Sequence, residues 1–153
     1  MDNNIIMGDI VFNVKPDAVP YNCRISYKVP QICLIMYLCG WNCTCSLVKL
    51  QIISHFLKSD NIDDLIAYID GRGKIPVIRF DSTVNSTLKF AVAYGLVNQE
   101  KNGKFKLSEN GKKFVSQIVK NKELLVYETN TLKTLSKKLS EEKIKELFDP
   151  RRY

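Results

Sequence analysis

The sequence predicts a mainly α-helical domain that carries a β-hairpin between two of its helices. Apolar residues recur at three- and four-residue steps over much of the 153-residue chain, which is the period of amphipathic helices. One segment departs from this period, because two short runs flank an Asn102-Gly103 pair, a strong signal for a tight hairpin turn. With 45% hydrophobic and 25% charged residues, the composition is that of one globular domain with its own core.

The first 28 residues are expected to form an extended arm. Polar and apolar residues alternate over part of residues 9–15, and Pro16 and Pro20 follow, so an extended segment is favoured over a helix. We therefore expect an arm over residues 1–28, followed by the main domain over residues 29–119.

Two helices are predicted at the start of the main domain. Pro30 suits the first turn of a helix, where its missing amide hydrogen does no harm, and Gly40 suits the end of that helix. Ser46 can cap a second helix over residues 47–57. The apolar residues of this second helix recur at helical spacing: Leu47, Leu50, Ile53, Phe56 and Leu57.

Two further helices are predicted before the hairpin. Asn61 can cap a short helix that ends at Gly71. Asp81 or Ser82 can cap another helix over residues 83–94, because short polar side chains accept hydrogen bonds from the free amides of a first turn.

The hairpin and the helix after it are the most informative part of the sequence. Residues 96–100 and 104–107 are expected to be its strands, and Ser108 opens the next helix. Further helical sequence over residues 120–153 predicts a C-terminal extension. A helix, a hairpin and another helix in this order predict a winged helix-turn-helix, with the hairpin as its wing.

The cysteines predict neither disulfides nor a metal site. Their odd number argues against a disulfide framework, and their spacing lacks the paired C-x2-C pattern of structural zinc sites. We expect reduced thiols, no bound metal and no cofactor. The five residues are Cys23, Cys33, Cys39, Cys43 and Cys45.

No common catalytic or phosphate-binding motif is present in the sequence. The one histidine, His55, lies on a predicted helix without a recognisable nucleophile and orienting group. Asp63 and Asp64 are adjacent, so on a helix they point in different directions and suit a helix start better than acid–base catalysis. We therefore expect no enzymatic activity.

The positive charge lies in the second half of the chain. The first 75 residues hold seven basic and seven acidic side chains, so the formal net charge of +7 comes from the remainder. Lysines on the hairpin and the flanking helices are candidate phosphate contacts for non-specific DNA binding, although a soluble surface is the first explanation of a charge of this size. These candidates are Lys89, Lys101, Lys104, Lys106, Lys112 and Lys113.

The first residues and the apolar runs predict a cytoplasmic location. The chain opens on Met1-Asp2-Asn3-Asn4, whereas a secretory signal opens on basic residues followed by an apolar run. No apolar run reaches the length of about 18 residues that a membrane span needs. We therefore expect no membrane partner.

Residues 120–148 carry regularly spaced leucines among many lysines and glutamates. An exposed apolar stripe of this length predicts a homodimer or docking onto a coiled coil, with Leu132, Leu135 and Leu139 as the partner-binding residues. The alternative is that these helices fold back onto the same domain.

The chain resembles winged-helix proteins over residues 88–97 and 103–115, where an apolar helix ends in Gly-Leu-Val and Leu-Ser-Glu-x-Gly opens the next helix. Its wider layout, with the segments 46–50 and 76–79, resembles the small middle component of bacterial three-component ABC/SMC-type ATPase defence systems such as Lamassu. The resemblance implies a non-catalytic anti-phage adaptor that links an SMC-like coiled-coil ATPase to an effector subunit.

The alternative function is a DNA-binding winged-helix transcriptional regulator. Residues 83–94 would then be the helix that reads bases, yet beside apolar and small residues they offer only Asn85, Lys89 and a few hydroxyls. Protein binding is therefore the preferred prediction, DNA regulation the second and catalysis a distant third.

Overall fold

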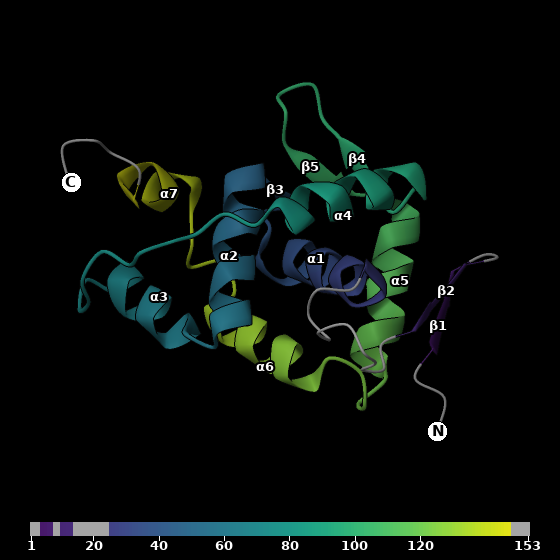
Figure 1. Ribbon diagram of the computed structural model, residues 1–153, viewed down its shortest axis with the longest axis horizontal. Coiled ribbons are helices and arrows are strands. Elements are labelled where there is room, and N and C mark those ends of the chain that lie inside the picture. The colour runs from purple at the N-terminus through teal and green to yellow at the C-terminus, as the bar shows by residue number, and fades with distance from the viewer. Residues whose placement is uncertain (1–3, 8–9, 14–24, 148–153) are drawn as a thin grey trace.

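The computed structural model describes residues 4–7, 10–13 and 25–147 of the chain. Most of these residues are helical, with a small antiparallel sheet and a separate two-stranded ribbon (Figure 1). The helices are α1 (Ile25–Cys39), α2 (Leu47–Ser59), α3 (Ile62–Ile69), α4 (Ser82–Ala93), α5 (Glu109–Lys120), α6 (Val126–Leu135) and α7 (Glu141–Leu147). The strands are β1 (Asn4–Met7), β2 (Ile10–Asn13), β3 (Thr44–Cys45), β4 (Val97–Gln99) and β5 (Phe105–Leu107).

Helix α1 is the centre of the domain, with α2, α4, α5 and α6 packed around it (Figure 1). Most of its residues are buried, which is the arrangement expected of a helix that is apolar on nearly every side. The predicted start at Pro30 is wrong, because α1 begins five residues earlier and holds Pro30 in its interior. An interior proline loses one helical hydrogen bond. Burial of Tyr27 and Val29 offsets this loss, and the boundary expected after residue 28 falls inside the helix.

The hairpin is confirmed, as β4 and β5 pair antiparallel with Gln99 opposite Phe105. Gly103 adopts a φ of 86°, which glycine tolerates best, and its amide donates to the carbonyl of Glu100 at 3.0 Å. Strand β3, which the sequence did not reveal, pairs with the other edge of β5, so the sheet order is β3-β5-β4. The sheet therefore ties the hairpin to the segment between α1 and α2.

Three predicted helix caps are confirmed by hydrogen bonds. Ser46 accepts from the amide of Lys49 at 3.2 Å, Asp81 from that of Thr83 at 2.9 Å, and Ser108 from that of Gly111 at 3.0 Å. Asn61 stands before α3, but its side chain makes no capping hydrogen bond.

The C-terminal helices fold back onto the domain. Leu132, Leu135 and Leu139 have no exposed surface, so the expected exposed stripe is wrong and the folded-back alternative is correct. Helix α6 packs against α1 and α3. In the contact with α1, the hydroxyl of Tyr27 donates to a carboxylate oxygen of Glu128. These leucines complete the core because α1 is apolar on the side that faces α6 as well.

The ribbon of β1 and β2 pairs Ile5 with Phe12. Strand β2 falls within the stretch predicted as extended, whereas Pro16, Pro20 and Cys23 lie outside the described residues. Among the helices that the structure describes, none combines the length and the apolar character needed to cross a bilayer.

Candidate functional site

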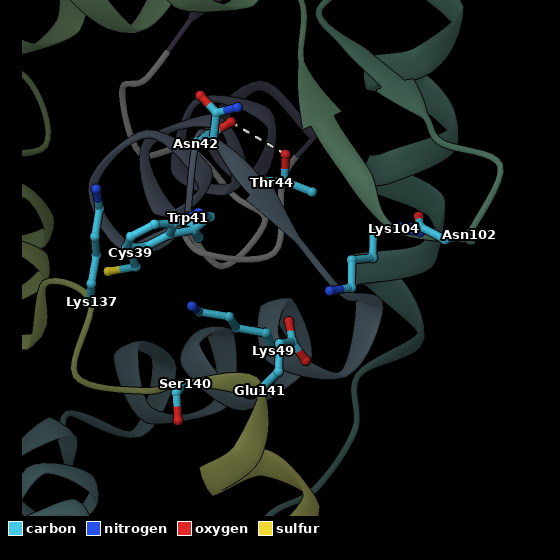
Figure 2. Close-up of a pocket in the computed structure, with 10 residues that line it drawn as sticks. All are labelled: Cys39, Trp41, Asn42, Thr44, Lys49, Asn102, Lys104, Lys137, Ser140 and Glu141. Atoms are coloured by element: carbon cyan, nitrogen blue, oxygen red, sulfur yellow. Dashed lines mark hydrogen bonds between the residues drawn. The ribbon is translucent and has the colours of Figure 1, made fainter.

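Two surfaces flank the hairpin, and we name them by their chemistry. The basic hollow, of about 480 Å³, is lined by residues that include Trp41, Lys49, Asn102, Lys104, Lys137 and Glu141 (Figure 2). The apolar groove, of about 500 Å³, is lined by residues that include Leu47, Leu88, Lys89, Val92, Gln99 and Phe105.

Strand β5 separates the two surfaces. Successive side chains of a strand point to opposite faces, so Lys104 and Phe105 turn in opposite directions although they are neighbours in sequence. Lys104 lines the basic hollow and Phe105 the apolar groove. Gln99, opposite Phe105 on β4, lines the groove as well.

Lys49 is the most unusual residue of the basic hollow. It lies in the first turn of α2 and is only 4% exposed, a rare state for a lysine. Figure 2 shows its side chain reaching into the hollow toward the space that Lys104 also approaches. Within the described residues, its ammonium has neither a hydrogen bond nor an ion pair. A buried cation of this kind lacks the partner that buried charges ordinarily have.

Trp41 and Lys137 form the rim of the hollow. Trp41 is the single tryptophan of the chain and is 78% exposed in the loop between α1 and β3. The ammonium of Lys137, in the loop between α6 and α7, lies 5.3 Å from the centre of the indole ring, a cation–π contact. The rim thus combines an exposed aromatic surface with a second cation.

Glu141 provides the one carboxylate that lines the hollow within the part of the chain that the structure describes. Its Oε2 accepts a hydrogen bond from the hydroxyl of Ser46 at 3.1 Å, which ties the start of α7 to the start of α2. Against this carboxylate stand the ammonium groups of Lys49, Lys104 and Lys137. Three positive charges and one negative charge leave the hollow with a formal charge of +2.

The cysteines near the hollow are poor nucleophiles. Burial raises the pKa of Cys39 and of Cys45 to about 12, although the nearby Lys49 lowers both in part. Burial alone raises the pKa of Cys33 to about 12. These thiols are therefore protonated at neutral pH, and only a thiolate attacks or binds metal. Within the described part of the chain, no group of three or more His, Cys, Asp or Glu residues is placed to hold a metal ion.

The apolar groove lies between α4, the start of α2 and the hairpin. Val92 is 40% exposed and Leu47 is 37% exposed, while Asn85 and Lys89 are the polar residues that α4 contributes. Beyond the groove, Tyr94 is exposed and its ring packs against Phe90 with centroids 4.3 Å apart. The C-terminal end of α4, with Val92, Ala93 and Tyr94, is therefore the apolar part of its exposed surface.

The start of α4 is held against α2. The Gln51 side-chain amide donates to the carbonyl of Asp81 at 3.0 Å, and its oxygen accepts from the amide of Asp81 at 2.8 Å. Burial opposes ionisation of Asp81, but hydrogen bonds from Thr83 and the charges of Lys28 and Lys58 lower the pKa of this carboxyl overall. These contacts fix the direction in which α4 leaves α2.

The six lysines predicted as phosphate contacts do not form one site. Only Lys104 lines the hollow, and Lys89 lines the groove. Lys101 is exposed at the hairpin turn, and Lys106 lies on β5 opposite Thr44 and Asn98. On α5, Lys112 lies 3.3 Å from a carboxylate oxygen of Glu109, and Lys113 is exposed. The three leucines predicted to bind a partner are in the core and cannot reach one in this conformation.

Sequence reasoning missed Lys49, Lys137 and Trp41. The sequence held a signal for Lys49. Lys49, Ile53 and Phe56 have the spacing of one helix face, so the sequence places a charged residue on the face that is predicted to be buried. Comparison of the chain with family profiles, with curated proteins and with solved structures gives no match.

Proposed function

We propose that the chain is a non-catalytic adaptor of the winged-helix type, which binds a partner protein through the apolar groove in the cytoplasm. The observation that carries this proposal is the side of α4 that lines the groove. Val92 and Leu88 line the groove there, and Asn85 and Lys89 are its only side chains in the groove with donors. Reading base edges needs several donors and cations on one face, so this helix suits a protein surface better than a DNA groove.

The arrangement of the sheet supports the winged-helix assignment. The hairpin follows α4 directly, as a wing follows its preceding helix, and α5 begins at the cap Ser108 immediately after it. The second hairpin strand also pairs with the short strand between α1 and α2, which anchors the wing on the helical core.

The partner that we propose is the SMC-like coiled-coil ATPase indicated by the family resemblance, with an effector subunit as the second partner in anti-phage defence. A groove of apolar side chains with polar residues at its margins suits the apolar stripe of a helix. Lys89 and Gln99 stand in the groove beside Leu88 and Phe105, and they are able to fix the register of such a helix by hydrogen bonds or charge.

The test is co-expression with the coiled-coil ATPase encoded beside this chain, followed by co-purification. Val92→Asp is expected to abolish the complex while the domain stays folded, because Val92 is exposed and contributes to the groove. The matched control is Val126→Asp, the same substitution at a valine that is 45% exposed and outside the groove.

Three results would overturn the adaptor proposal. One is the absence of a coiled-coil ATPase gene beside this chain, and another is equal co-purification of Val92→Asp and Val126→Asp. The third is protection of one defined DNA sequence by the isolated chain at elevated salt, which would identify a transcriptional regulator instead. Self-association through the groove predicts loss of a homodimer in Val92→Asp, and size-exclusion chromatography detects it.

A further inference from the structure

We propose that the basic hollow binds the terminal phosphate of a nucleotide, either as a free nucleotide or at the 5′ end of a nucleic acid. This inference goes beyond the adaptor function and does not depend on it, because the hollow and the apolar groove share no lining residue. Its basis is a nearly buried lysine whose ammonium has no hydrogen bond or ion pair among the described residues, the charge balance of the hollow and an aromatic ring on the rim.

Lys49 indicates that the hollow holds an anion. Burying an ammonium group costs free energy unless a counter-charge or several hydrogen bonds compensate for it. In the described structure its ammonium has no such partner, although most of the side chain is buried. A lysine that is 96% buried and reaches into a hollow is the arrangement expected of a site that holds an anion.

The charged residues that line the hollow indicate the charge of that anion. Among the described residues that line the hollow, the three lysines and Glu141 leave a formal charge of +2, and this net charge attracts a doubly charged anion more strongly than a singly charged one. A terminal phosphate carries nearly two negative charges at neutral pH, whereas a peptide carboxylate or an internal phosphodiester carries one. The charge balance therefore favours a phosphate monoester over these two alternatives.

The rim of the hollow indicates what the rest of the ligand is. Trp41 presents an exposed ring at the rim, and nucleobases stack on such rings. Lys137 lies over the ring, so a cation stands beside the position that a base or a second phosphate would take. A volume of about 480 Å³ is within the range of pockets that hold small ligands. A ligand with a phosphate near Lys49 and a base near Trp41 is a nucleotide.

The test uses the full chain and the fluorescence of Trp41, which reports on this site alone because the chain has one tryptophan. The probes are AMP, adenosine, and a short single-stranded oligonucleotide with either a 5′-phosphate or a 5′-hydroxyl. AMP and the 5′-phosphorylated strand are expected to change the emission, and the two unphosphorylated probes are expected to bind at least about tenfold more weakly.

The decisive variant is Lys49→Met, which keeps the length of the side chain and removes its charge. We expect it to weaken binding of the phosphorylated probes at least about tenfold, because a charge-assisted hydrogen bond is lost. The matched control is Lys101→Met, the same substitution at an exposed lysine of the hairpin turn that does not line the hollow. If Lys49→Met does not fold, Lys104→Met provides the same comparison at a partly exposed position.

The outcomes separate the two sources of the phosphate. Response to AMP alone identifies a free nucleotide, response to the 5′-phosphorylated strand alone identifies a nucleic-acid end, and response to both supports the shared phosphate monoester. Adenosine or the 5′-hydroxyl strand binding as tightly as its phosphorylated counterpart would overturn the proposal. So would a Lys49→Met protein that binds like Lys101→Met, or the absence of any response at about 1 mM of each probe.

Discussion

The basic hollow and the apolar groove lie on opposite faces of one hairpin, yet they draw on different parts of the chain. Apart from Leu47, the groove comes from residues 85–105, which are near neighbours in sequence. The hollow draws residues from Cys39 to Glu141 and holds Lys49, a lysine that is only 4% exposed. A docking surface of exposed apolar residues thus needs little from the rest of the fold, whereas the hollow requires the C-terminal helices and tolerates an unfavourable charge.

The largest expected effect comes from the core that supports both surfaces. Leu132→Asp with Leu135→Asp would bury two carboxyl groups in the contact between α6 and α1, so we expect a loss of about 4 kcal/mol or more and an unfolded domain. Circular dichroism during thermal unfolding measures this loss. The control is Lys133→Asp, an exposed position between them on the same helix. A folded double variant would show that α6 is dispensable to the core.

The next effect concerns the base of the hairpin. A Cβ atom at Gly111 would lie 2.1 Å from the carbonyl oxygen of Leu96, so Gly111→Ala forces α5 and the hairpin apart. We expect a loss of about 2 kcal/mol, a typical cost of overpacking. Urea unfolding measures it, with Asn110→Ala, at an exposed residue of the same helix turn, as the control. Equal stability of the two variants would contradict the close approach of α5 to Leu96.

Lys49→Met tests the energetic difference between the two surfaces directly. Lys49 is nearly buried and its ammonium has no partner among the described residues, so removal of its charge is expected to stabilise the ligand-free protein by about 1 kcal/mol. On the groove side, Val92→Asp replaces an exposed residue and is expected to change the stability by less than about 0.5 kcal/mol. Both values come from urea unfolding without ligand. A destabilised Lys49→Met would show that the ammonium has a stabilising role within the fold.

The smallest expected effect is the pH dependence of Asp81, which caps the helix along the groove. Its folded-state pKa is lowered, so the charge stabilises the fold above the unfolded-state pKa of about 3.9 and this contribution is lost as the pH falls through the folded-state pKa. Asp81→Asn keeps an acceptor but removes the charge. Its stability is expected to lie below that of the wild type at pH 7 and to converge with it in acid.

Urea unfolding from pH 7 to pH 2.5 measures this convergence. Glu100→Gln, at an exposed carboxylate of the hairpin, serves as the control and is expected to show no comparable difference at pH 7. A stability difference for Asp81→Asn that stays constant over the whole range would assign the effect to hydrogen-bond geometry instead of charge.

Features that depend on a few neighbouring residues could be predicted from the sequence. The caps Ser46, Asp81 and Ser108 each act within three residues, and Asn102-Gly103 specifies a turn by its own backbone preferences. The hairpin and the helices α2, α4 and α5 follow from these local signals. Local chemistry is sufficient for them because the tertiary contacts reinforce the same backbone conformations.

Features that depend on distant contacts could not be predicted. Pro30 suits a helix start by itself, but packing against segments about a hundred residues away, as between Tyr27 and Glu128, extends α1 beyond it. The leucines of α6 have the same spacing whether they face a partner or their own core. The hollow was missed for a related reason, because Trp41, Lys49 and Lys137 meet only after α6 and α7 have folded back.

The central position of α1 has a consequence for synthesis on the ribosome. This helix leaves the ribosome early, whereas the residues that cover it extend to α6, so that Cys39 meets the carbonyl of Leu132 across 93 residues. An apolar helix whose partners are still untranslated has no stable fold of its own and is exposed to aggregation. We expect the nascent domain to remain protease-sensitive until residue 135 has cleared the exit tunnel and to depend on chaperones before that point.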